Sequence, residues 1–206
     1  MTPYDHRFAI LSHDGTFLEF WGKQGTGNGE FNLTRSNGDG YGGIAFAQDG
    51  SFFVNDAGNR RIQEFDAKRR FVRSWGGYGS DPGKYSDPVG IAVGPDDNVY
   101  VLDDVRGVVE KYDRDGNVLG EIRAFSNTSP GFNKANALAI DANGKIYVSQ
   151  IDPNQVAMFD PDGTLVRTFG DTGPGQFHEQ AGFMAIDRAG RLFVGQGPER
   201  GDRYGY

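Results

Sequence analysis

Few residues of this 206-residue chain are equipped for nucleophilic or metal chemistry. It has no cysteine, which excludes a disulfide, a thiolate metal site and a cysteine nucleophile, and it has no G-x-S-x-G nucleophile elbow. The segments DRDG (113–116) and DPDG (160–163) begin like calcium loops but lack the later ligands and the closing Glu, so they predict hairpin turns. GDGYGG (38–43) has dinucleotide-motif spacing, yet it leads into a strand-like run rather than a helix.

Composition favours strands and turns over helices. The chain has 32 Gly, 16 Phe and 9 Tyr, and no sustained helical stripe of apolar residues. Its net charge of −7 disfavours nucleic acid as a partner. The first residues lack a basic start followed by an apolar core, and we expect no membrane interaction. The compartment stays open: a complete chain would be cytoplasmic, and one that has lost a leader would be extracellular or periplasmic.

Hydrophobic positions recur with a period of about 47 residues. Ile44, Ile91, Leu138 and Met184 lie 47, 47 and 46 residues apart, and Phe53, Tyr100, Tyr147 and Phe193 keep the same spacing. Such a period is the signature of a repeat architecture, in which each unit buries its faces against its neighbours.

Each repeat contains four alternating apolar runs, which we name strands A, B, C and D. In the first complete repeat these runs fall near 44–47, 51–54, 61–66 and 70–75, and Asp/Gly-rich turns join A to B and C to D. Four antiparallel strands per repeat predict an all-β fold, a β-propeller of four-stranded blades. We expect full blades at 43–76, 90–122 and 137–170, a C/D half blade at 7–22 and an A/B half blade at 183–206.

These repeats resemble the NHL-repeat family, within the TolB-like superfamily of propellers. The resemblance is carried by DPVGIAVGPDDNVYV (87–101), NDAGNRRIQEFD (55–66) and GPGQF (173–177), and it extends over nearly the whole chain. It implies rings that usually have six blades. Two arrangements stay open: a closed four-bladed ring in which the two half blades combine, or an arc of a larger propeller whose open edges at 8–11 and 192–194 drive association.

Antiparallel order places the D–A connections and the B–C loops on one face of the disc, which we call the loop face. Because loops on a rigid scaffold commonly carry binding residues, this face supplies our candidate binding site. The alternative interpretation is that these polar residues brace one blade against the next. The candidates are Arg35, Asn37, Tyr41, Asp56, Asn59, Arg60, Tyr78, Asp103, Arg106, Asn154, Gln155, His178 and Gln196.

One aromatic residue recurs near the end of each D–A connection and follows a glycine by one or two positions. These residues are Phe31, Tyr85, Phe132 and Phe177. A binding site needs one constellation, whereas packing is needed in every blade, so the recurrence predicts a structural role.

The resemblance also directs attention to metals. Lyases similar to this family hold zinc through His just before strand A, where this chain has Gly42, Val89, Asn136 and Gly182. The histidines present are His6, His13 and His178, which the fold would divide between both faces, so we expect no zinc site. Lactonase-like propellers use Glu, Asn and Asp around a channel calcium, and Asn55, Asp103 or Asn136 would lie near the axis.

The charge of the loop face argues against RNA. Its connections hold eight basic residues (Lys23, Arg35, Arg60, Lys84, Arg106, Arg123, Lys134, Arg200) and eleven acidic ones (Glu30, Asp39, Asp56, Asp81, Asp87, Asp103, Asp104, Asp152, Asp171, Glu179, Glu199). We therefore expect a non-enzymatic scaffold, without a cofactor, that binds a protein, a peptide or copies of itself. The alternative is a metal-dependent lyase or lactonase-like enzyme with a channel calcium, and RNA binding ranks below both.

Overall fold

The computed structural model describes residues 6–34, 42–123, 135–151 and 153–197, together with the backbone of two short strands at 125–126 and 129–130. Three four-stranded antiparallel sheets dominate, and in each the strands pair in chain order. The first sheet contains β5 (Ile44–Phe46), β6 (Phe52–Asp56), β7 (Arg61–Phe65) and β8 (Phe71–Gly76). The second sheet contains β9 (Pro88–Val93), β10 (Val99–Asp103), β11 (Val108–Tyr112) and β12 (Val118–Arg123). The third sheet contains β15 (Ala135–Ile140), β16 (Ile146–Ile151), β17 (Asn154–Phe159) and β18 (Leu165–Phe169). The all-β propeller prediction is confirmed, and the sheets coincide with the three full repeats.

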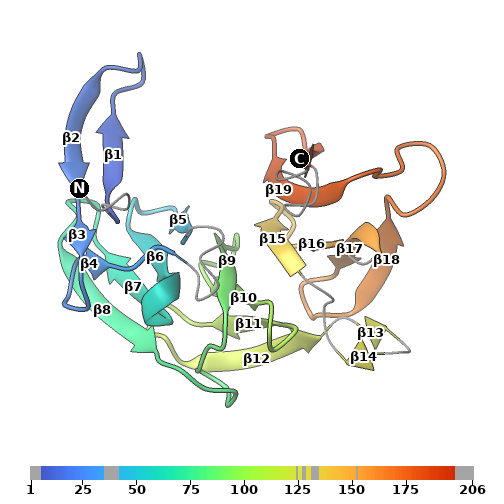
Figure 1. The fold of residues 1–206 in the computed structure, drawn as a ribbon, viewed down its shortest axis with the longest axis horizontal. Helices are drawn as coiled ribbons and strands as arrows, with labels where there is room; N and C mark the ends of the chain where they lie inside the picture. The colour runs from blue at the N-terminus through green and yellow to red at the C-terminus, as the bar shows by residue number, and fades with distance from the viewer. Residues whose placement is uncertain are drawn as a thin grey trace, which may run out of the picture.

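Two-stranded sheets stand at the ends of the arc. One joins β1 (Phe8–Leu11) to β2 (Phe17–Trp21), and the other joins β19 (Gln180–Ile186) to β20 (Leu192–Gly197). These half blades do not pair with each other, and Figure 1 shows them on opposite sides of an open gap. The part of the chain that the structure describes is therefore an open arc and not the closed four-bladed ring that the sequence left as one alternative.

The remaining elements are short. β3 (Lys23–Gln24) pairs in parallel with β4 (Glu30–Phe31), and β13 (Phe125–Ser126) pairs with β14 (Ser129–Pro130). A single turn of 3-10 helix, η1 (Ala57–Asn59), links β6 to β7. Within the described ranges, no helix has the length and apolar character needed to cross a membrane.

The hydrophobic core lies between the blades. Successive residues of a strand point to opposite faces of its sheet, so each blade contributes to two core layers. In β10, Val99 and Val101 pack with Phe53 of the first blade, whereas Tyr100 and Leu102 pack with Ile146 of the third. The half blade β1–β2 joins in the same way, because Trp21 lies 4.8 Å, centroid to centroid, from Phe65 in an edge-on contact. Burial between sheets is thus what ties each blade to its neighbour.

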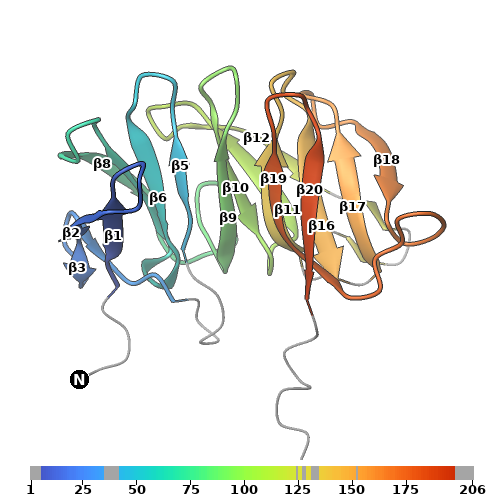
Figure 2. The same cartoon turned by 90° about the horizontal axis from the view of Figure 1, so that it is seen from above.

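Strand A of each blade is innermost. β5, β9, β15 and β19 surround the middle of the arc, and β9 packs between β5 and β15 (Figure 1). Figure 2 shows the A–B hairpins β5–β6 and β9–β10 at one end of the strands. The D–A connections and B–C loops therefore share the opposite face, as the antiparallel order predicts.

The recurring aromatic residues of the D–A connections pack against glycines at the ends of the D strands. Tyr85 is fully buried, and a Cβ on Gly76 would lie 2.7 Å from its ring. Phe31 meets Gly22 and Phe177 meets Gly170 in the same way, and all three glycines have positive φ. A side chain at these glycines would displace the ring, so the structure gives the aromatic residues the packing role. Phe132 lies outside the described residues.

Candidate functional site

Three of the four inner strands that the structure describes, β9, β15 and β19, carry a bulge where they reach the loop face. The ladder shifts register at Val89 in β9, at Asn136 in β15 and across Gly182–Phe183 in β19. A bulge leaves one residue unpaired and turns its side chain away from the regular alternation, and bulges often occur beside active sites. These positions are the ones singled out before strand A, together with Gly42 of the first blade.

Asn136 is the one residue among these bulge positions with an amide or other oxygen-bearing side chain. It is half-buried, and in the described part of the chain its side chain makes no hydrogen bond. The neighbouring β16 residue Ser149 accepts a hydrogen bond from the amide of Ala137 (2.9 Å). Asn136 is therefore held on a braced backbone while its amide group stays available to a ligand.

Asn55 occupies the equivalent of Ser149 in the first blade, but its side chain is already committed. Its Nδ2 donates to the carbonyl of Pro88 (3.0 Å), which ties β6 to β9 of the next blade. Its Oδ1 is buried and accepts no hydrogen bond from the described residues. Because burying a bare acceptor is costly, this oxygen is a candidate for a further partner near the axis.

Asp56, at the end of β6, fastens a neighbouring connection to its blade through several hydrogen bonds, and we call such a buried, multiply bonded side chain a brace. Its buried carboxylate accepts hydrogen bonds from the amide of Asn32 (2.6 Å), from Nδ2 of Asn59 and Nε of Arg61 (2.7 Å), and from Nε2 of Gln63 (3.0 Å). Asn59 also donates to the carbonyl of Gly25 (2.8 Å). These contacts fasten the preceding D–A connection to the blade, so the Asp56 carboxylate and Nδ2 of Asn59 are both occupied.

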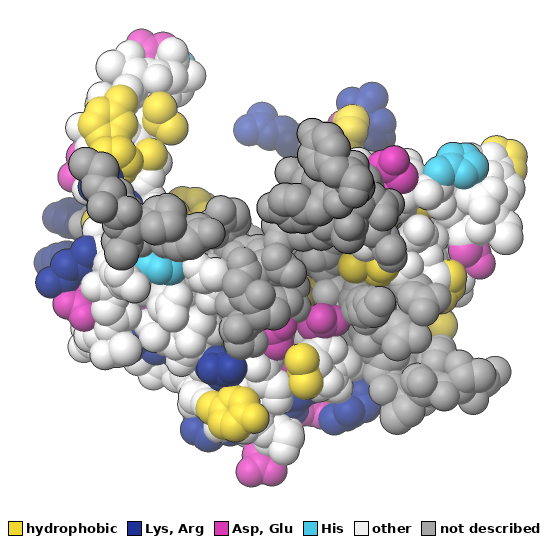
Figure 3. Space-filling view, viewed as in Figure 1, with side chains coloured by type: hydrophobic (Ala, Val, Ile, Leu, Met, Phe, Trp, Pro, Cys, Tyr) yellow, Lys and Arg dark blue, Asp and Glu magenta, His cyan; other side chains and the backbone are white. Residues whose placement is uncertain are grey.

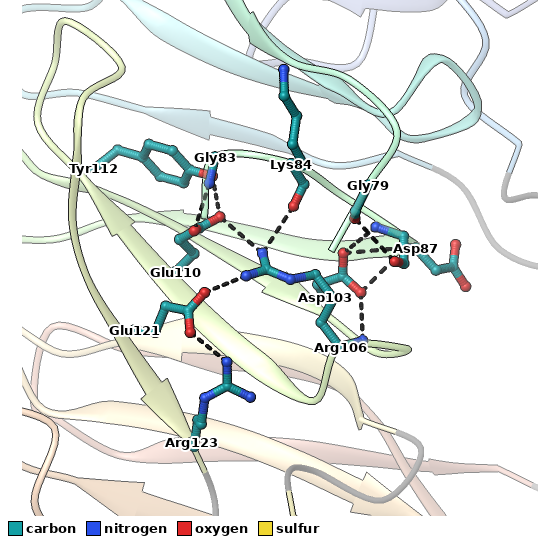
Figure 4. Close-up of polar contacts among 11 residues, drawn as sticks. Gly79, Gly83, Lys84, Asp87, Asp103, Arg106, Glu110, Tyr112, Glu121 and Arg123 are labelled. Carbon is teal, nitrogen blue, oxygen red and sulfur yellow. Dashed lines mark hydrogen bonds and ion pairs between the residues drawn. The ribbon is translucent and has the colours of Figure 1, made fainter. Parts of the chain in front are cut away.

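Asp103 repeats this arrangement in the second blade. Its carboxylate accepts hydrogen bonds from the amides of Ser86 (2.7 Å), Asp87 (3.2 Å) and Arg106 (2.9 Å), as Figure 4 shows. Gln196 does the same in the last half blade, where its Oε1 accepts a hydrogen bond from the amide of His178 (3.1 Å). The end of strand B thus recurs as an anchor for the D–A connection.

Glu110 and Arg106 form a buried ion pair beside Asp103. The guanidinium contacts Glu110 at 3.1 Å and also pairs with Glu121, while Glu110 accepts hydrogen bonds from the amide of Gly83 (2.8 Å) and the hydroxyl of Tyr112 (Figure 4). Burial alone would lower the pKa of Arg106, but the two carboxylates raise it above the usual value. Burial raises the pKa of Tyr112. The network keeps its charges paired and does not open to a substrate.

Other candidates lie at the rim of the loop face. Arg60 donates to the carbonyl of Ser86 (3.1 Å), and its guanidinium lies 4.9 Å from the ring centroid of Tyr78, which is 77% exposed. Gln155 donates to Gln150 (2.7 Å) within the third blade. Oδ1 of Asn154 is buried and accepts no hydrogen bond from any described residue.

The structure therefore divides the predicted binding residues into several groups. Asp56, Asn59, Asp103, Arg106, His178 and Gln196 take part in braces, and Arg60 and Tyr78 form an exposed cation–π pair. Arg35, Asn37 and Tyr41 lie outside the described residues. Sequence reasoning did not single out Glu110 and Gln63, although both are polar residues at the same repeat position in an otherwise apolar strand C, which was the available signal.

The described residues do not supply a metal cage. They contain no group of three or more His, Cys, Asp and Glu side chains placed to hold a metal ion. His6 accepts a hydrogen bond from the amide of Leu33 (3.0 Å). Calcium needs six to eight oxygen ligands, whereas the bulge positions provide one side-chain oxygen, that of Asn136. The described residues therefore do not fit a calcium ion in the channel.

Charge on the loop face is mixed rather than of one sign. Figure 3 views this face and shows acidic and basic side chains next to one another over the second blade. Single hydrophobic side chains stand between them, Tyr78 being an exposed example. Over the residues that the structure describes, this face shows no broad field of one sign that would steer a highly charged partner.

The four-stranded sheets and their arrangement define a β-propeller fold. Residues 83–170, which make up less than half of the chain, match the family model described as SMP-30/Gluconolactonase/LRE-like region. No curated protein matches the sequence. The match favours a gluconolactonase-like model, so membership of the NHL-repeat family stays a prediction.

Solved propeller structures share the fold at low identity. A catalytically inactive virginiamycin B lyase from Staphylococcus aureus with quinupristin has a TM-score of 0.63 at 15% identity over 93% of this chain and 56% of that one. A gluconolactonase from Xanthomonas campestris has a TM-score of 0.59 at 19% identity, covering 91% of this chain and 61% of that one. A protein of unknown function from Bacteroides caccae has a TM-score of 0.65 at 14% identity, with coverages of 97% and 67%. The chain spans little more than half the length of the lyase.

Proposed function

We propose that this chain belongs to a lactonase- or lyase-type β-propeller enzyme and binds a small polar substrate on the loop face, close to the axis. The observation that carries the proposal is the match of residues 83–170, two successive blades, to a gluconolactonase-like model. Similar folds that are named as a lyase and as a gluconolactonase support the same class. The comparisons lend no support to a non-enzymatic scaffold, so the enzyme alternative replaces it as our main hypothesis.

Asn136 is the proposed contact to the substrate. Its amide can donate to and accept from the polar atoms of an ester or a sugar-like ring. It projects from a bulge on the innermost strand of the third blade, within the segment that matches the family model. The surrounding backbone is fixed by Ser149, so the amide needs little ordering on binding.

No catalytic step through a metal follows from the residues described. A carboxylate-rich cage is absent from them, and Asn136 alone cannot hold calcium. The chain's own contribution, as proposed here, is to bind and orient the substrate at the axis.

The test combines turnover and binding. Wild-type protein is assayed for ring opening of gluconolactone and other small lactones, with and without EDTA, beside Asn136→Ala. The control variant Asn143→Ala changes an exposed asparagine in the A–B hairpin of the same blade, on the opposite face. We expect turnover that Asn136→Ala reduces at least tenfold and that Asn143→Ala leaves unchanged.

Two results would overturn the proposal. Absence of turnover and of calorimetric binding for every lactone tested, at protein concentrations where the fold is intact, would reject the lactonase activity that the match of residues 83–170 supports. Equal loss in both variants would show that Asn136 acts through folding instead of through contact with the substrate. Calcium titration of EDTA-treated protein is a separate arm: stoichiometric uptake that Asn136→Ala abolishes would show that other residues complete a cage with Asn136.

A further inference from the structure

The two ends of the arc carry complementary half blades. β19–β20 supplies strands A and B, and β1–β2 supplies strands C and D of the same repeat unit. In all three full blades strand B pairs with strand C, through β6–β7, β10–β11 and β16–β17. β20 therefore lacks a C strand, and β1 lacks a B strand, in the described chain.

Neither of these two edge strands carries a charge or a proline. Natural edge strands usually carry a charge or a proline that blocks association with another sheet. The outer D strands follow this rule, since β8 contains Arg73, β12 contains Glu121 and Arg123, and β18 contains Arg167. By contrast, β1 reads FAIL and β20 reads LFVGQG, with no charge and no proline.

Side chains that full blades bury are exposed at both ends. Leu11 is 56% exposed, whereas its repeat equivalents Phe65 and Tyr112 are buried. Phe193 is also 56% exposed, although Phe53 and Tyr100 at the same position are buried. Figure 3 shows hydrophobic side chains gathered on the projecting β1–β2 sheet. In the full blades these positions are buried against a neighbouring sheet, as Phe53 is against Val99 and Val101, so the apolar surface exposed here is one that a further sheet would cover.

We propose that the β1–β2 sheet of one copy completes the blade begun by β19–β20 of a second copy. A copy of this chain is the fitting partner because its strand β1 belongs to the same repeat that β20 lacks. Within one chain the two half blades face each other across the gap of the arc and are held apart by three packed blades (Figure 1). The contact is head-to-tail, so it builds rings or longer assemblies according to the angle between copies.

The repeat sets the register of the composite blade. Val54 pairs with Gln63, Val101 with Glu110 and Val148 with Ala157. The equivalent residues are Val194 in β20 and Ala9 in β1, so these two pair between copies. The same alignment places Phe193 opposite Ile10, and Leu192 opposite Leu11.

Cysteine cross-linking tests this register, because the chain has no cysteine of its own. Ala9→Cys protein is mixed with Val194→Cys protein under mild oxidation, and Ile10→Cys is mixed with Phe193→Cys in parallel. We expect a disulfide-linked species of twice the 22.5 kDa chain mass in at least one matched mixture. The control mixture, Ile10→Cys with Val194→Cys, is one residue out of register and presents its thiols on opposite faces of the sheet, so it should not cross-link.

A second pair of variants distinguishes this contact from nonspecific hydrophobic association. Phe193→Lys places a charge on the β20 edge and should convert an associating protein into a monomer in light scattering behind a sizing column. Val166→Lys, at a similarly exposed apolar position on β18, should leave association unchanged. Three results would each overturn the proposal. The first is a wild-type protein that is monomeric at every concentration, and the second is equal cross-linking in matched and mismatched mixtures. The third is a cross-link that forms only within single chains carrying both cysteines.

Discussion

The brace at Asp56 makes a sharp prediction about stability. Replacing Asp56 with Ala removes the acceptor for the amide of Asn32, the amide group of Asn59, the guanidinium of Arg61 and the amide group of Gln63. The carboxylate is fully buried, and the side chain of Arg61 is only 16% exposed. The substitution therefore leaves the amide of Asn32 without its acceptor and the largely buried guanidinium of Arg61 without its carboxylate, although Arg61 still donates to the carbonyls of Gly27 and Glu30.

The size of the effect follows from that burial. Removing one member of a buried ion pair typically costs about 3–5 kcal/mol, because the remaining charge is uncompensated. In a domain of this length, about 1 kcal/mol shifts the melting temperature by roughly 2–4 °C. Asp56→Ala should therefore lower the melting temperature by roughly 6–20 °C.

Calorimetry and circular dichroism measure this shift, with Asp66→Ala as the control. Asp66 also accepts hydrogen bonds from backbone amides and from an arginine, but it lies in a solvent-facing hairpin of the same blade. Its loss should lower the melting temperature much less than the loss of Asp56, because solvent screens and replaces the contacts of this exposed carboxylate. If the two variants melt together, burial of the brace does not contribute to stability and the reasoning is refuted.

Two further predictions concern a glycine and a carboxyl group. Gly76→Ala should destabilise the fold by about 2–4 kcal/mol in denaturant titration, since it combines a positive φ with a clash against Tyr85. The control Gly15→Ala also has a positive φ but lies in open space, so it should cost about 1 kcal/mol. Equal costs for the two variants would contradict this reasoning. Hydrogen bonding from Ser51, followed by the contact with Arg114, lowers the pKa of Asp49 to about 2. The stabilisation is complete above the ordinary value of 3.8 and is lost as pH falls toward 2. Carboxyl NMR should show this midpoint, and Ser51→Ala should raise it; an unchanged midpoint would refute the assignment.

The architecture could be predicted because the same physical demand recurs in every repeat. Each blade must bury both faces, so aromatic and branched residues return at a fixed spacing, as Phe53 and Tyr100 do. Tight hairpins add Asp and Gly at regular intervals, for instance at Asp141 and Gly144, where the carboxylate accepts turn amides and the glycine has positive φ. A single sequence contains several copies of this evidence.

The binding residues were harder to predict because their partners are distant in sequence. Asp56 was placed correctly on the loop face, but its partner Asn32 lies 24 residues away in a connection of irregular length. Sequence position therefore indicated the face without revealing that the carboxylate is fully occupied. The sequence also could not show whether the ring closes, because complementary half blades can combine either within one chain or between two chains.

Recurrence itself separates scaffold from site. Near the end of strand B, Asp56, Asp103 and Gln196 each accept a hydrogen bond from a backbone amide of a D–A connection, so this repeat position anchors that connection in these three sheets. At the axial bulge the residue changes from Val89 to Asn136, which means that the bulge has no common structural duty and is free to differ between blades. We therefore expect a ligand at the axis to contact residues that depart from the repeat pattern. That is why we assign substrate contact to Asn136 and stability to the aspartates.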